Sequence, residues 1–194
     1  MRRLETARPQ TLRYALNELF FLAMMAVIAG ILIAAMAMQY GRGELPCPLC
    51  LIERAAMLGI CFGIMQNFRH GFSDRNLGFS LLFALVLLVV AVRQTLLDIY
   101  PRPGHEYVGS AVLGLHMPVW SVVIAVACIA AIALKLVILG SEQGKPGPRR
   151  GSRTATVAAV LSLLVVAIAA VNAASVVVQC GIGQCHTERY ALLD

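Results

Sequence analysis

Apolar residues are concentrated in five long stretches separated by short polar segments. The stretches cover 19–39, 51–65, 77–99, 119–139 and 154–178. A helix that crosses a hydrocarbon core of about 30 Å needs about 20 residues. Four stretches reach that length, and 51–65 reaches it only if its helix begins within the preceding cysteine segment. Each stretch is apolar around most of its circumference, so a soluble bundle would lack polar surface. The pattern predicts an all-α integral membrane protein.

The polar segments between these stretches suggest how the chain is organised. Residues 140–153 are rich in Gly, Pro and Arg, a composition typical of a flexible linker. A four-helix transmembrane bundle would therefore be followed by a separate fifth transmembrane helix. The expected units are an N-terminal segment 1–18, a four-helix core 19–139, a linker 140–153, a fifth helix 154–178 and a tail 179–194.

Composition supports a membrane protein and argues against a nucleic-acid partner. The chain is 59% hydrophobic and 13% charged, whereas soluble domains are roughly a quarter charged. The net charge of +6 comes from basic residues that lie between the apolar stretches. We therefore expect membrane lipid as the surrounding partner, and no nucleic acid.

The basic residues also predict the orientation of the chain. Only Arg42, Arg102 and Arg189 fall in segments on one side of the predicted membrane. Eleven fall on the other side: Arg2, Arg3, Arg8, Arg13, Arg69, Arg75, Lys135, Lys145, Arg149, Arg150 and Arg153. Short loops rich in Lys and Arg stay in the cytoplasm. The N-terminus is therefore predicted to be cytoplasmic and the C-terminus periplasmic.

Cysteines at the predicted outer face are candidates for redox chemistry. Disulfides persist on that side of the membrane, and four of the six cysteines fall there: Cys47, Cys50, Cys180 and Cys185. Cys47-Pro48-Leu49-Cys50 is a Cys-x-x-Cys motif at the start of a predicted helix, where free backbone N–H groups favour a thiolate. Cys61 and Cys128 lie inside helices and are expected to pack as small apolar residues.

Arg54 is a second candidate, one helical turn after Cys50. An arginine inside the membrane edge is unfavourable without an anionic or polar partner. A thiolate or the carbonyl of a bound cofactor would be such a partner, because positions four apart share a helix face. The alternatives are snorkelling to lipid headgroups and pairing with Glu53, which the helix directs to a different face.

Other functions also fit the same residues. The outer cysteines and His186 could form a zinc site, but their spacing is loose and we expect no metal. A copper-binding membrane protein would use Cys185, His186 and Met117. An assembly subunit with purely structural cysteines is another possibility, as is an enzyme that exports reducing power across the membrane.

Three segments carry a resemblance to a known family. Cys47-Pro48-Leu49-Cys50-Leu51-Ile52-Glu53-Arg54-Ala55 resembles the signature of the disulfide bond formation protein B (DsbB) family, between its first and second helices. Arg93-Gln94-Thr95-Leu96-Leu97-Asp98 is similar to the end of that family's third helix. Leu115-His116-Met117-Pro118-Val119-Trp120 is similar to the start of its fourth. The resemblance covers roughly residues 15–140.

This resemblance implies an oxidoreductase of the bacterial inner membrane. It would pass electrons from a periplasmic, DsbA-like dithiol oxidase to ubiquinone or menaquinone. Cys47 and Cys50 would be the quinone-proximal pair, with Cys50 facing the quinone. The residues expected to bind the quinone would be Arg54, Arg93, Gln94 and Asp98.

The chain also departs from the family pattern. Gln94 stands where many members have His, and Asp98 where many have Gln. The segment 100–118 contains no cysteine, although members keep their second, shuttle pair there. Cys180 and Cys185 instead follow the additional fifth helix. The short Cys-Gly-Ile-Gly-Gln-Cys segment can close a disulfide, and we predict that it is the relocated shuttle, with a static disulfide as the alternative.

Overall fold

The computed structural model describes residues 7–100, 111–141, 147–148, 151–181 and 191, and within these it is helical apart from short turns. The elements are α1 (Ala7–Arg42), α2 (Pro48–His70), α3 (Asp74–Ile99), α4 (Met117–Leu139) and α5 (Arg153–Cys180). All five helices are long and apolar enough to span a membrane. The predicted all-α, multi-span fold class is confirmed.

The helices extend beyond the apolar stretches because capping residues lie outside them. Cys47 caps α2, with its Sγ accepting a hydrogen bond from the Cys50 N–H at 3.1 Å, and Pro48 occupies the first turn. The helix therefore has 23 residues and includes the second cysteine, as the short stretch 51–65 required. The last helix, α5, ends at Cys180. This cysteine therefore belongs to the helix and not to the expected tail 179–194.

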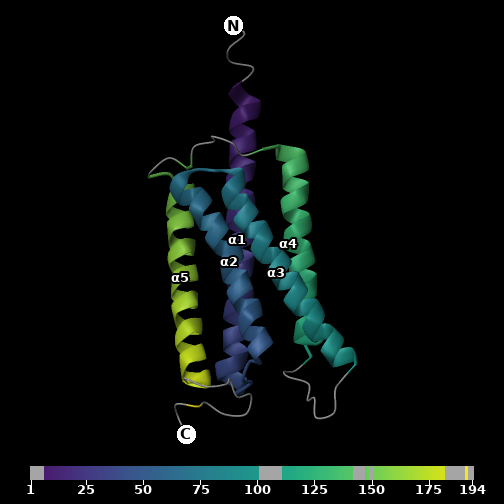
Figure 1. The fold of residues 1–194 in the computed structure, drawn as a ribbon. Helices are drawn as coiled ribbons and strands as arrows, with labels where there is room; N and C mark the ends of the chain where they lie inside the picture. The colour runs from purple at the N-terminus through teal and green to yellow at the C-terminus, as the bar shows by residue number, and fades with distance from the viewer. Residues whose placement is uncertain (1–6, 101–110, 142–146, 149–150, 182–190, 192–194) are drawn as a thin grey trace.

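The helices form a bundle in which α5 and α4 lie on opposite sides (Figure 1). α2 packs against α3, and α3 packs against α4. α5 packs against both α1 and α2. The C-terminal ends of α1 and α5 lie at the same end of the bundle as the start of α2 (Figure 1). The two cysteine-bearing helix ends are consequently neighbours.

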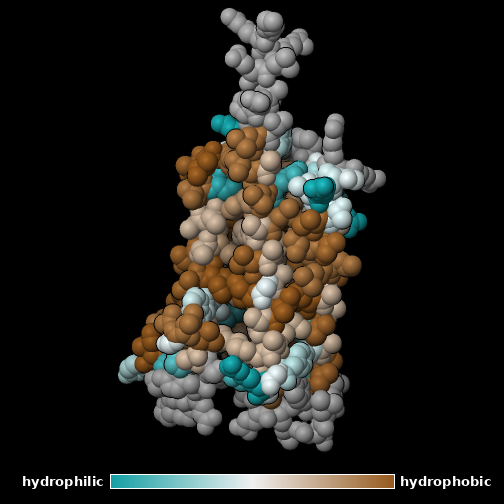
Figure 2. Space-filling view, turned by 180° about the vertical axis from the view of Figure 1, so that it is seen from behind, coloured by the Kyte–Doolittle hydropathy of each residue, from teal (hydrophilic) through white to brown (hydrophobic). Residues whose placement is uncertain are grey.

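Apolar side chains cover the middle of the bundle. Figure 2 shows an apolar band on one face, with hydrophilic residues gathered towards the two ends. Large apolar side chains on different helices are exposed, among them Leu19, Phe62, Val89, Val137 and Leu163. Such an exterior matches lipid chains and does not match water.

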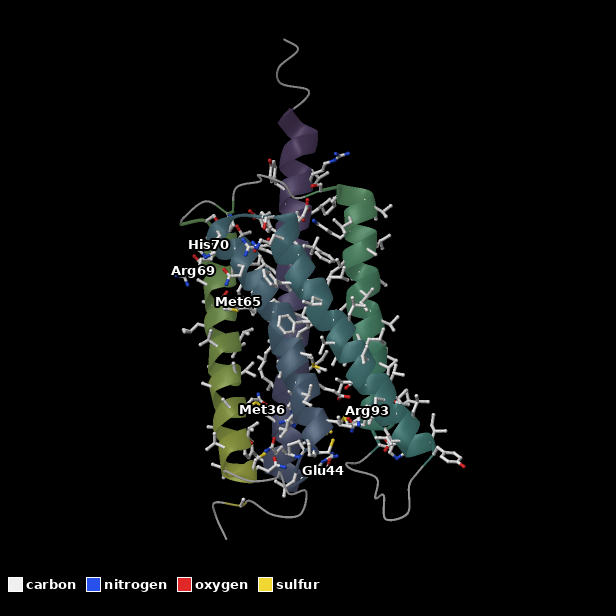
Figure 3. All side chains as sticks on the ribbon, viewed as in Figure 1. Met36, Glu44, Met65, Arg69, His70 and Arg93 are labelled. Carbon is white, nitrogen blue, oxygen red and sulfur yellow. The ribbon has the colours of Figure 1, made fainter. Side chains whose placement is uncertain are left out.

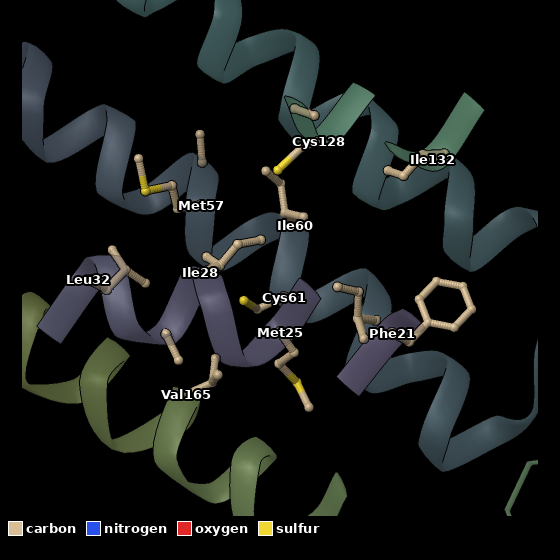
Figure 4. Close-up of a cluster of buried hydrophobic side chains, with 14 of the residues drawn as sticks. Phe21, Met25, Ile28, Leu32, Met57, Ile60, Cys61, Cys128, Ile132 and Val165 are labelled. Atoms are coloured by element: carbon tan, nitrogen blue, oxygen red, sulfur yellow. The ribbon is translucent and has the colours of Figure 1, made fainter. Parts of the chain in front are cut away.

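The buried core lies between the helices and contains two cysteines that are distant from the dithiol. Cys61 and Cys128 are free thiols packed among Met25, Ile28 and Ile60 (Figure 4). They are buried in apolar surroundings, where a cysteine packs as a small hydrophobic side chain.

Close contact between α2 and α3 depends on Gly63. A Cβ at this position would lie 2.7 Å from the Asn76 carbonyl oxygen and 2.8 Å from the Ser80 nitrogen. The Ser80 hydroxyl meanwhile donates to the Ile60 carbonyl at 3.0 Å. Small residues allow such close backbone approach in membrane bundles. This contact sets the separation of the two helices that carry Cys50 and Gln94.

Candidate functional site

The Cys-x-x-Cys pair is held by a side chain from α3. Gln94 Nε2 lies 3.2 Å from Cys47 Sγ and 3.3 Å from Cys50 Sγ, and donates to both. Both cysteines are free thiols, and Gln94 is 6% exposed. A single buried amide therefore keeps the two sulfurs in contact with the same donor group, close to each other and shielded from bulk solvent.

The environment of Cys47 distinguishes it from its partner. Its hydrogen bond with the Cys50 side chain, together with burial, raises the pKa of Cys47 well above its ordinary value. Cys47 consequently stays protonated at neutral pH. A thiolate is the nucleophile in thiol exchange, so this arrangement favours Cys50 as the reactive sulfur of the pair.

Glu53 is buried beside the dithiol instead of lying at the headgroup level. It is 5% exposed and accepts a hydrogen bond from Ser121 Oγ of α4 at 2.7 Å. Its other oxygen, Oε1, and the Gln94 side-chain oxygen have no hydrogen-bond partner among the described residues. Two buried acceptors near the sulfurs are thus available to a donor such as a thiol, water or a ligand hydroxyl.

Arg54 has polar partners on two other helices. Its Nη1 donates to Gln39 Oε1 at 2.6 Å and to Asn172 Oδ1 at 3.4 Å. Its Nη2 donates to the Ala35 carbonyl at 3.2 Å. Sequence analysis predicted that this arginine needs a partner, and the structure supplies neutral oxygens from α1 and α5. Neither snorkelling nor a bond to Glu53 is needed to accommodate the cation.

Sequence analysis missed the polar residues of α5. Ser175 Oγ accepts from Gln39 Nε2 at 2.7 Å, and Gln179 Nε2 donates to the Pro46 carbonyl at 2.8 Å. A signal was available in the spacing of Asn172, Ser175 and Gln179, since positions i, i+3 and i+7 share one helix face. Polar residues on one face of an otherwise apolar membrane helix indicate a protein contact.

The predicted quinone-binding residues on α3 have different surroundings. Arg93, which is labelled in Figure 3, is exposed on α3. It lines an apolar hollow with Val89, Leu96 and Tyr100. Its neighbour Gln94 faces inward because consecutive residues on a helix point apart. Asp98 is half-buried one turn further on, close enough to Glu53 for their charges to interact.

The second predicted cysteine pair is only partly within the described residues. Cys180 is buried and disulfide-bonded, whereas Cys185 and His186 lie outside the described part of the chain. The Gln179 contact with Pro46 places the end of α5 beside the segment that leads to Cys47. Among the described residues, no group of three or more His, Cys, Asp or Glu side chains could hold a metal ion.

Comparisons with known proteins identify similar sequences. The profile of the family described as disulfide bond formation protein DsbB matches residues 17–107. A disulfide bond formation protein B of Aromatoleum aromaticum is 34% identical over 87 residues, which is 42% of this chain and 51% of that protein. One of Azoarcus sp. is 32% identical over 99 residues, 45% of this chain and 58% of that protein.

The similarity is confined to part of each protein. The chain spans about half the length of the curated relatives that it matches, at 51% and 58%. The matched residues 17–107 include Cys47, Cys50, Arg54 and Gln94, and they end before α4. No solved structure matches the chain. The polar face of α5 therefore lies outside the region of family similarity.

Proposed function

We propose that this chain, which is similar to disulfide bond formation proteins of the DsbB family over residues 17–107, is a quinone-dependent thiol oxidoreductase. It lies in the bacterial inner membrane and reoxidises a DsbA-like dithiol oxidase of the periplasm. The observation that carries this proposal is the Gln94 amide, which holds both sulfurs of the Cys-x-x-Cys pair at 3.2 and 3.3 Å. An arginine one turn further on completes the arrangement.

Electrons travel from the partner to the membrane in two exchanges. A thiolate of the partner attacks the Cys180–Cys185 disulfide, and a mixed disulfide forms and is resolved by the partner's second thiol. The reduced Cys180–Cys185 pair then attacks the Cys47–Cys50 disulfide in the same way. Each exchange moves two electrons and two protons and leaves the donor pair as a disulfide. The Cys47–Cys50 pair ends reduced.

A bound quinone would supply the acceptor for these two electrons and two protons. Its oxygens are hydrogen-bond acceptors, and Arg54 presents a planar fork of donors in the half-buried region next to Cys50. Gln94 and Glu53 provide buried oxygens that have no partner among the described residues. The Glu53 carboxylate can take up a proton as it leaves a thiol, and the Gln94 oxygen can accept a hydrogen bond. The donor set and the acceptor set together fit a quinone.

The predicted orientation of the chain supports a periplasmic location for both cysteine pairs. The eleven basic residues counted above favour a cytoplasmic N-terminus. Five spans then bring the C-terminus to the periplasm. Cys47, Cys50 and Cys180 all lie at helix ends on that side; Cys50 is half-buried, whereas Cys47 and Cys180 are buried.

The test uses purified protein in lipid vesicles, with reduced DsbA-like protein as donor and ubiquinone-1 as acceptor. Quinone absorbance should fall as the donor is oxidised, and Cys50→Ser should abolish this loss. Cys128→Ala is the matched control, because Cys128 is a core cysteine distant from the dithiol. Alkylation and mass spectrometry should show Cys47 and Cys50 oxidised only when quinone is added. Oxidation without any quinone requirement would contradict the proposal.

The role of the second pair can be separated from that of the first. Cys180→Ser with Cys185→Ser should stop oxidation of the protein donor, because no shuttle receives its electrons. Quinone reduction by dithiothreitol, which reaches Cys47 and Cys50 directly, should continue. Donor oxidation at the wild-type rate in this double variant would assign Cys180 and Cys185 to a static disulfide.

A further inference from the structure

The buried face of α5 is apolar in its first half, with Val165 and Ile168 in the core, and polar towards its C-terminal end. Asn172, Ser175 and Gln179 are 7%, 6% and 0% exposed. Large apolar side chains such as Val160 and Leu163 are 62% and 72% exposed on the same helix. A polar group in a hydrocarbon environment is unfavourable unless another polar group satisfies it. The contacts made by this face therefore determine how α5 docks.

The first contact fixes the orientation of the Gln39 amide. A guanidinium has donors and no acceptor, so the atom of Gln39 that faces Arg54 at 2.6 Å must be the oxygen. The amide nitrogen is consequently directed to Ser175 Oγ at 2.7 Å. Gln39 is only 2% exposed, and the hydroxyl of Ser175 satisfies its NH₂ group in that orientation. Ser175 thus presents the Gln39 oxygen to Arg54.

The second contact is direct. Asn172 Nδ2 donates to the Ile168 carbonyl at 2.9 Å and contacts Met36 Sδ at 3.3 Å. Met36 lies where α1 faces α5 (Figure 3). With its nitrogen used in this way, the Asn172 oxygen faces Arg54 at 3.4 Å. The same argument applies as for Gln39, because the arginine requires an acceptor.

The third contact reaches the other side of the dithiol. Gln179 Nε2 donates to the carbonyl of Pro46 at 2.8 Å, and Pro46 directly precedes Cys47. Because proline fixes its own φ angle, a bond to its carbonyl restrains the backbone where the chain enters the motif. α5 thus contacts the Cys-x-x-Cys segment before Cys47 and, through Arg54, after Cys50.

We propose that α5 is a positioning element of the redox site, with Asn172 and Ser175 acting through Arg54 and Gln179 acting through Pro46. The inference rests on the proposed function in one respect, the use of Arg54 to bind quinone. The inference itself is that α5, which lies outside the matched residues 17–107, holds the Arg54 guanidinium beside Cys50. Weakening that face should alter the chemistry of the dithiol without removing any group that touches it.

The experiment compares Asn172→Ala and Ser175→Ala with Ser162→Ala. Ser162 is the matched control, since its hydroxyl donates to the Ala158 carbonyl of its own helix at 2.7 Å. The KM for ubiquinone-1 should rise about five- to ten-fold in the two test variants. Asn172→Ala removes a hydrogen bond to the Arg54 guanidinium, and Ser175→Ala removes the hydroxyl that orients Gln39 towards it. The kcat should stay within about two-fold. Asn172→Asp keeps an acceptor for Arg54 and should retain the wild-type KM.

Coupling to Arg54 separates positioning from general loss of structure. In an Arg54→Ala background, the further substitutions Asn172→Ala and Ser175→Ala should leave the KM unchanged, because their effect passes through the missing guanidinium. Equal effects in both backgrounds would overturn the inference. So would a wild-type KM in the single variants, while quinone reduction itself would remain established.

A measurement without quinone keeps the inference independent of the proposed function. The Cys47–Cys50 pair is equilibrated with dithiothreitol redox buffers and read by alkylation and mass spectrometry. A cation beside the reduced pair stabilises a thiolate, so both test variants should shift the equilibrium several-fold towards the disulfide. If the wild-type protein does not reduce quinone, the proposed function fails. The equilibrium of the Cys47–Cys50 pair still tests the inference: a shift in both variants supports the positioning of Arg54 by α5, and no shift in either variant contradicts it.

Discussion

At the scale of single residues, the Gln94 amide has an unusual role for a buried glutamine. Its NH₂ group carries two hydrogens, and the two sulfurs at 3.2 and 3.3 Å can accept one each. The hydrogen bonds strengthen when a sulfur carries negative charge, since charge-assisted bonds exceed neutral ones. Gln94 should therefore stabilise the reduced pair more than the disulfide.

Replacing Gln94 by leucine tests this preference. Gln94→Leu keeps a similar volume and removes both donors, so the Cys47–Cys50 equilibrium with dithiothreitol should move about ten-fold towards the disulfide. Gln66→Leu is the matched control, because Gln66 lies on α2 in the cavity at the other end of the bundle. An unchanged equilibrium in Gln94→Leu would limit the glutamine to a packing role.

At the scale of the elements, the α2–α3 contact determines whether Gln94 can reach the sulfurs. The two helices approach closely at Gly63, where a Cβ would meet backbone atoms of α3. Backbone atoms cannot move aside as the end of a flexible side chain can. Any side chain at this position must separate the helices or shift their register.

Gly63→Ala should therefore destabilise the bundle by about 1–3 kcal/mol, the usual cost of overpacking. Gly30→Ala is the control: a Cβ there meets nothing within 4 Å, and alanine is the better helix former. Thermal unfolding in detergent micelles measures both. A Gly63→Ala protein as stable as the Gly30→Ala protein would show that α2 and α3 tolerate a wider separation.

Hydropathy predicted the helices well but not how they are rotated. The five spans follow from apolar length alone, whereas their ends depend on caps such as Cys47 and Ser152. Arg93 and Gln94 are adjacent, and only packing against α2 shows that Gln94 faces the dithiol. The partners of Arg54 lie 15 and 118 residues away in sequence, at Gln39 and Asn172. Such long-range pairs are set by tertiary contacts that hydrophobic periodicity cannot specify.

At the scale of the whole molecule, an odd number of spans separates the two termini. Figure 1 shows the start of α1 and the end of α5 at opposite ends of the bundle. The Cys47, Cys50 and Cys180 helix ends share the C-terminal side. Because the basic residues favour a cytoplasmic N-terminus, we expect all three cysteines to lie on the periplasmic side.

Reporter fusions test the orientation. A periplasm-active reporter fused after Asp194 should be active, and the same reporter fused in the 140–153 linker should be inactive. The pair forms its own control, because only α5 separates the two fusion points. Activity at the linker and none after Asp194 would place Cys180 on the reducing side and exclude its use as a shuttle.

The hydrogen bonds that Arg54 and Gln39 donate to α5 also impose an order on biogenesis. Translation delivers α1 and α2 to the bilayer more than a hundred residues before Asn172, which is separated from Arg54 by 118 positions. Until the final span inserts, the guanidinium lacks its Asn172 partner and Gln39 lacks the hydroxyl that satisfies its amide NH₂ group. The polar surroundings of Arg54 are consequently complete only after α5 has been inserted. A ribosome that stops before α5 leaves a membrane-inserted Cys-x-x-Cys segment whose neighbouring arginine is incompletely held.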